Sequence, residues 1–186
     1  DKYGDARRTE IAHVSGEMDI EDLIPEEECV FTLTHAGYIK RQPADTYQAQ
    51  RRGGRGITAL SRKEEDFVEE LFLASTHDYL LFVTDQGRIY RLKGYQVYEG
   101  SRTSKGTNIV NLLPLQGGEQ VAGMLRVPKE HMQAEGEQEK YLVIVTKNGI
   151  IKRTPLSAYA NIRKSGLIAI NLNEGDRLAW TRITSG

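Results

Sequence analysis

The sequence predicts an all-β fold: a propeller-like array of four-stranded blades, about three repeats forming a partial ring, with a short N-terminal connector. Two observations point to the array, an internal repeat with a strand-turn-strand pattern and further apolar segments at matching offsets. Composition supplies a third, because 186 residues with 39% hydrophobic residues, 18 Gly, 5 Pro and a net charge of −1 exclude a disordered chain. No apolar run approaches the roughly 20 residues that span a bilayer. A single cysteine, Cys29, cannot form an internal disulfide.

The repeat is the pattern T-x-x-G-x-I-x-R, found at residues 34–41, 84–91 and 146–153. An apolar run precedes each copy, so each copy predicts a strand, a tight turn with Gly at a positive-φ position, and a second strand. Successive first glycines are 50 and 62 residues apart, and the longer interval contains the polar stretch 129–140. We therefore expect three hairpins, with a surface insertion after the second.

Two more segments complete each repeat. A polar loop closes at a second glycine, after which a third strand is expected, and a fourth strand is expected at 67–73, 121–127 and 178–183. Four short strands with a period of this size are typical of propeller blades. We place the connector at 1–25 and the repeats at about 26–76, 77–138 and 139–186. Three unrelated hairpins in a sandwich are the alternative, which the shared offsets of Thr, Gly, Ile and Arg disfavour.

Charge is segregated along the chain. Residues 38–63, 86–106 and 147–166 hold 17 Lys and Arg against only Asp45 and Glu99, a net charge of +15. Equivalent loops of a blade array emerge on the same side, so these basic blocks would line one rim, a surface suited to a polyanion. The residues that we expect on this basic rim are Lys40, Arg41, Arg91, Lys93, Arg102, Lys105, Lys152, Arg153, Arg163 and Lys164.

The sharpest local feature is an Arg-Gly loop made of Gln50, Arg51, Arg52, Gly53, Gly54, Arg55 and Gly56. Glycines let the backbone approach a phosphodiester while each guanidinium makes a bidentate contact. No catalytic signature accompanies it, because the four histidines are scattered and no Ser/His/Asp or Cys/His arrangement is present. We therefore expect a binding module and not an enzyme.

The Arg-Gly loop resembles, in all seven positions, the heptapeptide box of the DNA gyrase A family. Residues 5–11, 19–25 and 34–41 resemble that family too, as does each repeat, so the similarity covers essentially the whole chain. It implies the exit segment of the breakage-reunion core followed by the start of the C-terminal β-pinwheel. That pinwheel usually has six blades, of which three repeats are present here.

The resemblance also implies a function. The segment would bind, bend and chirally wrap duplex DNA without sequence specificity, in support of ATP-dependent negative supercoiling by a bacterial, cytoplasmic, nucleoid-associated holoenzyme. Its partners would be duplex DNA, the remainder of the gyrase A polypeptide and the gyrase B polypeptide in an A2B2 assembly, with no membrane. No metal or cofactor is expected in this segment, because ATP and Mg act elsewhere in the holoenzyme. The catalytic tyrosine belongs to the core, so the segment alone would not cleave DNA.

Three alternatives stay open. The C-terminal domain of the topoisomerase IV A polypeptide is the nearest, although an intact box disfavours it. A second alternative is a propeller that scaffolds other proteins, whose binding would not depend on salt concentration. A third is an RNA binder, which would prefer single-stranded RNA to duplex DNA in direct competition.

Overall fold

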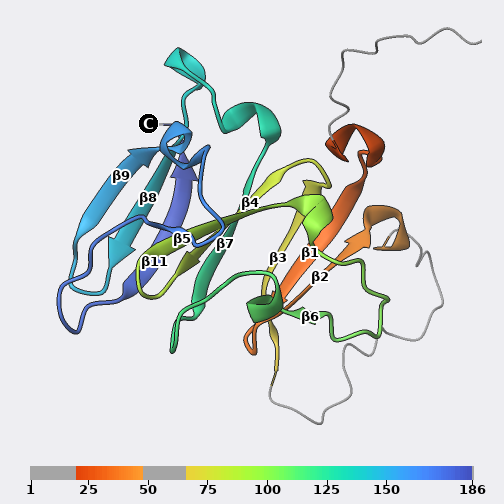
Figure 1. Cartoon of the computed structure of the whole chain (residues 1–186), viewed down its shortest axis with the longest axis horizontal. Helices are drawn as coiled ribbons and strands as arrows, with labels where there is room; N and C mark the ends of the chain where they lie inside the picture. Colours follow the sequence, from red (N-terminus) through yellow and green to blue (C-terminus); the bar gives the residue numbers. More distant parts are fainter. Residues whose placement is uncertain (1–19, 48–65, 186) are drawn as a thin grey trace, which may run out of the picture.

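Three antiparallel sheets stand side by side in chain order in the computed structural model, which describes residues 20–47 and 66–185 (Figure 1). We call them blade 1, blade 2 and blade 3. Blade 1 has the strand order β3 (Val68–Ser75), β1 (Glu28–Thr34), β2 (Tyr38–Pro43), β6 (Thr107–Asn108). Blade 2 has the order β10 (Leu167–Ile168), β5 (Arg88–Lys93), β4 (Tyr79–Thr84), β7 (Val121–Val127). Blade 3 has the order β11 (Leu178–Thr184), β8 (Tyr141–Thr146), β9 (Ile151–Pro155).

Short 3-10 turns connect the strands, and the described part of the chain contains no α-helix. The turns are η1 (Ile20–Leu23), η2 (Ala44–Tyr47), η3 (Gly94–Gln96), η4 (Ile109–Asn111), η5 (Lys129–His131), η6 (Gly136–Gln138) and η7 (Leu156–Tyr159). η5 and η6 lie in the polar stretch 129–140, which the sequence predicted as an insertion.

Blades exchange strands, which the repeat pattern did not reveal. The third strand of a repeat pairs with the hairpin of the preceding repeat: β6 lies against β2 and β10 lies against β5. The second glycine permits this approach, since Gly106 has φ +92° and a Cβ there would lie 2.5 Å from the carbonyl oxygen of Ile39. Each sheet therefore combines strands from two successive sequence repeats. Blade 3 has three strands among the described residues. The repeat limits stay a prediction.

The core fills the two spaces between neighbouring blades. Phe31 and Ile39 of blade 1 pack with Phe82, Tyr90 and Met124 of blade 2 in one cluster. A second cluster joins alternate residues of β4 and β5 to β8 of blade 3, including Leu81, Val83, Ile89, Leu142 and Ile144. Successive side chains of a strand point to opposite faces. The central strand β4 is thus buried on both faces, which explains its continuous apolar run.

The order of the sheets defines an inner and an outer edge. β7, one edge strand of blade 2, contacts both β3 of blade 1 and β11 of blade 3, so these three edge strands define the inner side of the array. Gly123 of β7 allows this packing, because a Cβ there would lie 2.8 Å from Cγ2 of Thr181 in β11. The opposite edges, formed by β2 with β6, β5 with β10, and β9, consequently lie on the outside.

Each hairpin turn is closed by its threonine. The hydroxyl oxygens of Thr34, Thr84 and Thr146 each accept a hydrogen bond at 3.1 Å from the amide four residues later. The turn glycines all have positive φ, at +82°, +80° and +85°, which confirms the predicted backbone at Gly37, Gly87 and Gly149 and follows from the absence of a Cβ.

An acidic residue clasps each of these turns from the loop before the last strand of the repeat. Asp66 accepts a hydrogen bond from the Ala36 amide at 2.8 Å, and Asp176 accepts one from the Asn148 amide at 3.0 Å. In blade 2 the Thr84 hydroxyl donates to Glu119 at 2.7 Å. Each acid stands two residues before an apolar strand, a signal that the sequence contains but our prediction missed.

Glu119 is a buried acid, and its replacement should be costly. Its Oε2 accepts from the Tyr90 hydroxyl at 2.9 Å and from the Gln116 amide at 2.8 Å. Glu119→Gln puts an NH₂ donor in place of one acceptor, so we expect a loss of about 1–3 kcal/mol in the free energy of unfolding. Urea titration measures it, with Gln120→Glu, the reverse change at the neighbouring exposed position, as the control. Equal stability of E119Q and wild type would contradict the clasp.

Two of the clasps should make stability acid-sensitive. Burial raises the pKa of Asp176, but hydrogen bonds from Thr146 and from the Asn148 and Arg177 amides outweigh it and lower the pKa overall; the pKa of Asp66 is lowered in the same way. A carboxyl with a depressed folded pKa stabilises fully above its unfolded pKa of about 3.9, and this stability is lost as the pH falls through the lower folded value. The urea midpoint should therefore drop on acidification toward about pH 3.

Asp176→Asn should flatten that drop, because the side chain no longer titrates. Glu174→Gln, in the same turn and exposed, should keep the wild-type profile. Identical profiles for D176N and wild type would rule out Asp176 as a contributor.

Candidate nucleic-acid interface

The sharpest predicted feature, the Arg-Gly loop Gln50–Gly56, lies outside the described residues. Its contact with DNA stays a prediction. The ten residues predicted for the basic rim all lie within the described part.

Two loops run along the outer edges of the blades. We call residues 97–106 and 160–166 the crossing loops, because each leaves one blade and runs along the outer strand of the preceding one before pairing with it. The first is joined to β2 by backbone hydrogen bonds from the Arg41 amide to Tyr98 and from the Gly100 amide to Arg41. The first crossing loop therefore lies along β2, the outer hairpin strand of blade 1.

Cations of β2 hold the first crossing loop. The Lys40 ammonium donates to the carbonyls of Ser101, Arg102 and Ser104 at 2.9–3.2 Å, and burial lowers its pKa. The Arg41 guanidinium donates to the Val97 carbonyl at 2.8 Å and lies 3.7 Å from the Glu99 carboxylate. Both residues lie on β2, but their charges face the protein's own backbone and, for Arg41, the Glu99 carboxylate.

Cations of β5 do the same for the second crossing loop. Arg91 donates to the carbonyl of Ala160, and Arg88 donates to the carbonyl of Ser165 at 3.2 Å. Arg88 was absent from our predicted set, although its place beside the turn glycine of the repeat was a usable signal. Lys152 of β9 likewise donates to the Ala169 carbonyl at 2.6 Å.

Other rim cations point outward. Arg102 on the first crossing loop and Arg163 and Lys164 on the second are exposed, and no hydrogen bond or ion pair engages their charges within the described residues. Lys105 lies 4.2 Å from the ring centroid of Tyr38, and Arg153 lies 4.5 Å from that of Tyr141, both at the surface. Loops at equivalent places in two blades thus present cations to solvent.

A hollow of about 500 Å³ lies beside the second crossing loop. Arg163 and Lys164 line one side, Arg91 and Gln96 belong to the β5 side, and Val110 and Pro114 supply an apolar wall. A concave site with cations over an apolar wall can receive a sugar-phosphate backbone, since the phosphate meets charge and the sugar meets the apolar side chains.

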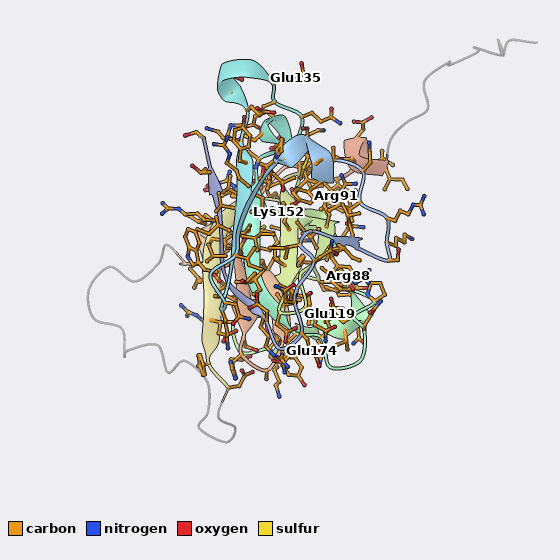
Figure 2. The ribbon with its side chains drawn as sticks, turned by 90° about the vertical axis from the view of Figure 1, so that its left-hand side faces the viewer. Arg88, Arg91, Glu119, Glu135, Lys152 and Glu174 are labelled. Carbon is orange, nitrogen blue, oxygen red and sulfur yellow. The ribbon has the colours of Figure 1, made fainter. Side chains whose placement is uncertain are left out.

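The charges are zoned along the strand direction (Figure 2). Arg88, Arg91 and Lys152 lie at middle height, between Glu135 toward one end and Glu119 and Glu174 toward the other. Arg88 also lies 3.9 Å from the buried Glu119 carboxylate. All three of these cations donate to backbone carbonyls, so their role in this zone is to hold the loop backbone in place.

Among the described residues, no group of three or more His, Cys, Asp or Glu is placed to hold a metal ion. Nor is any helix there long and apolar enough to cross a membrane.

Comparison with known proteins agrees with this architecture. The family model described as DNA gyrase C-terminal domain, beta-propeller, matches residues 30–75, 78–128 and 140–185. The chain therefore belongs to the DNA gyrase C-terminal domain family. This confirms the resemblance and the propeller-like fold class that the sequence predicted.

Curated relatives give the same result. The chain is 55% identical over 185 residues to the DNA gyrase A polypeptide of Clostridium acetobutylicum and 47% identical over 186 residues to that of Halalkalibacterium halodurans. Each match covers 100% of this chain and 22% of the relative. The chain thus spans about a fifth of the length of these relatives.

Solved structures share the fold. A DNA gyrase A C-terminal domain aligns with a TM-score of 0.62 and 26% identity, covering 85% of this chain and 48% of that one. The C-terminal domain of a DNA topoisomerase IV aligns with a TM-score of 0.70 at 24% identity, covering 88% and 47%. The latter likeness shows a common fold alone, and the family match favours gyrase over topoisomerase IV.

Lys40 should act as a positioning residue for the first crossing loop. Lys40→Met keeps the length of the side chain but leaves three carbonyls without their donor, so we expect faster hydrogen exchange at the Ser104 amide and about 1–2 kcal/mol lower stability. Duplex DNA should also bind more weakly than a single lost charge explains, because Arg102 loses its support. Lys147→Met, at an exposed turn, is the charge-matched control. Indistinguishable effects of the two variants would contradict this role.

Proposed function

We propose that this chain binds, bends and wraps duplex DNA along its outer rim without reading its sequence. The observation that carries the proposal is the pair of crossing loops, which present Arg102, Arg163 and Lys164 outward at equivalent places in neighbouring blades. The Arg-Gly loop occupies the corresponding place in the first sequence repeat. Membership of the gyrase C-terminal domain family supports the same function.

The physics of the rim fits phosphate-dominated binding. Arg and Lys that neutralise phosphates release counterions, which supplies affinity independent of sequence. Bending a duplex site of 20–30 base pairs costs about 1–6 kcal/mol. Cations along the rim offset this cost through additional contacts with the phosphate backbone of the DNA. Such contacts fix the path of the duplex but carry no direct base readout.

Within the whole protein, this wrapping would deliver a DNA segment to the cleavage gate and support ATP-dependent negative supercoiling. The gyrase B polypeptide and the remainder of the gyrase A polypeptide would be its partners, in the bacterial cytoplasm and at the nucleoid. The named relatives, all gyrase A polypeptides of bacteria, support this extension.

Fluorescence anisotropy with two unrelated duplexes and a single-stranded RNA, titrated with salt, tests the proposal. We expect equal affinity for both duplexes, weaker RNA binding, and log K that falls steeply with log salt. Preference for RNA would instead indicate an RNA binder, and binding that ignores salt would indicate a protein scaffold.

Removing free cations should lower the salt slope. For Arg163→Ala/Lys164→Ala we expect a slope smaller by about 1–2, at about 0.9 per lost phosphate contact, and weaker binding to both duplexes alike. Arg51→Ala/Arg52→Ala/Arg55→Ala should act in the same direction. Lys140→Ala/Lys147→Ala, which removes the same charge away from the crossing loops, is the matched control. An unchanged slope in the first two variants would refute the phosphate contacts.

A further inference from the structure

One carboxylate anchors the N-terminal connector to blade 2. Oε1 of Glu21 in η1 lies 2.9 Å from the Lys129 Nζ and 3.1 Å from the Lys93 Nζ. His77 Nδ1 stands 3.8 Å from the same oxygen, and the side chain of Glu21 is only 11% exposed. We call Lys93, Lys129 and His77 the anion seat.

The seat is assembled by blade 2 and its following insertion. Lys93 ends β5, His77 precedes β4, and Lys129 begins η5 in the polar insertion. His77 also donates from Nε2 to the Ile24 carbonyl at 2.8 Å, and Thr76 donates to the Pro25 carbonyl at 2.9 Å. Residues 20–25, the described part of the connector, are thereby held on the central blade, although they lead into blade 1.

Docking of η1 rests on polar contacts. Its two apolar side chains, Ile20 and Leu23, are 73% and 69% exposed, whereas Glu21 is its buried residue. Partial burial raises the pKa of Glu21, but hydrogen bonds from Lys129 and Lys93 outweigh this and lower the pKa overall. Such a contact depends on charge, so another anion can compete for the same two ammonium groups.

The anion seat adjoins the rim. Lys93 and Arg91 both lie against the ring of Tyr79, at 3.8 Å and 4.9 Å from its centroid. Arg91 and Gln96 line the hollow beside Arg163 and Lys164, and the Gln96 side chain accepts from the Lys93 amide at 2.7 Å. The hollow and the anion seat are therefore neighbours, joined through Tyr79 and Gln96. A polyanion bound in the hollow would lie next to the seat.

We propose that the anion seat is a phosphodiester-binding subsite which Glu21 occupies in the free chain, so that binding of duplex DNA there displaces the connector. A lysine ammonium group acts as a compact point charge, so it can bind a carboxylate or a phosphate. One seat cannot hold both anions, so connector docking opposes DNA binding and DNA opposes docking by the same factor. The inference rests on the proposed DNA binding of the rim.

Glu21→Gln in the 186-residue chain tests the competition by salt-titrated anisotropy. The neutral amide no longer holds the two lysines, so we expect duplex affinity at low salt to rise about three- to tenfold and the salt slope to steepen by about 1–2 as one or two phosphate contacts are added. Glu28→Gln, an exposed position with the same change of charge, is the matched control. Equal gains in both variants, or no gain in E21Q, would overturn the competition.

Lys129→Met identifies the seat as the source of the gain. In the Glu21→Gln background this change should remove most of the added affinity, whereas Lys147→Met should leave it. Retention of the full gain in E21Q/K129M would overturn the assignment. Urea midpoints of all variants show whether the blades stay folded.

Hydrogen exchange separates this inference from the proposed function. In wild type, added duplex should speed exchange at the Ile24 amide, which donates to the Glu21 carbonyl, and Glu21→Gln should speed it without DNA. Duplex binding with unchanged or slower exchange at residues 21–27 would overturn the displacement while leaving the rim function intact. Absence of duplex binding in every variant would instead count against the proposed function.

Discussion

The pairing of the short strand after each crossing loop with the preceding blade is the interaction on which the rest of this structure depends. β6 lies on β2 and β10 lies on β5, so neither blade 1 nor blade 2 is completed by its own repeat alone. In such a sheet, a segment of one repeat forms an edge strand of the preceding blade. Neighbouring blades are therefore joined by this strand pairing as well as by the cores between them. It also brings the crossing loops to the outer edges, where they carry their cations beyond the strands.

Basic residues divide into two groups under this constraint. Lys40, Arg41, Arg88 and Arg91 donate to loop carbonyls and so fix the path of the crossing loops. Arg102, Arg163 and Lys164 remain available to a ligand on the same loops. A basic rim is therefore a layered surface, in which inner cations hold the loops and outer cations face solvent. Counting charge in the sequence cannot separate the two, because both groups occur in the same basic blocks.

Much of the fold could be predicted because its signals are local. A β-branched hydroxyl, a turn glycine and alternating apolar residues recur at fixed offsets, and each acts within a few residues of itself. Glu119 and its equivalents were missed because each clasp joins residues 28 to 35 positions apart, and the acid's place before an apolar strand does not by itself identify its partner. The seat around Glu21 was beyond the sequence for the same reason, since its two cations come from Lys93 and Lys129, which are 36 residues apart in the chain.

The sequence by itself determined the hairpins, the number of repeats, the segregation of charge and the family resemblance, since strand and turn propensities act locally and the motif recurs at fixed offsets. Only the tertiary structure decided which edge each third strand joins, which cations are engaged and which are free, and where the connector docks. Those outcomes depend on close approaches between distant segments, such as Gly106 on Ile39. This packing determines whether a basic side chain contacts a carbonyl oxygen, a carboxylate or solvent. The order of residues along the chain does not show it.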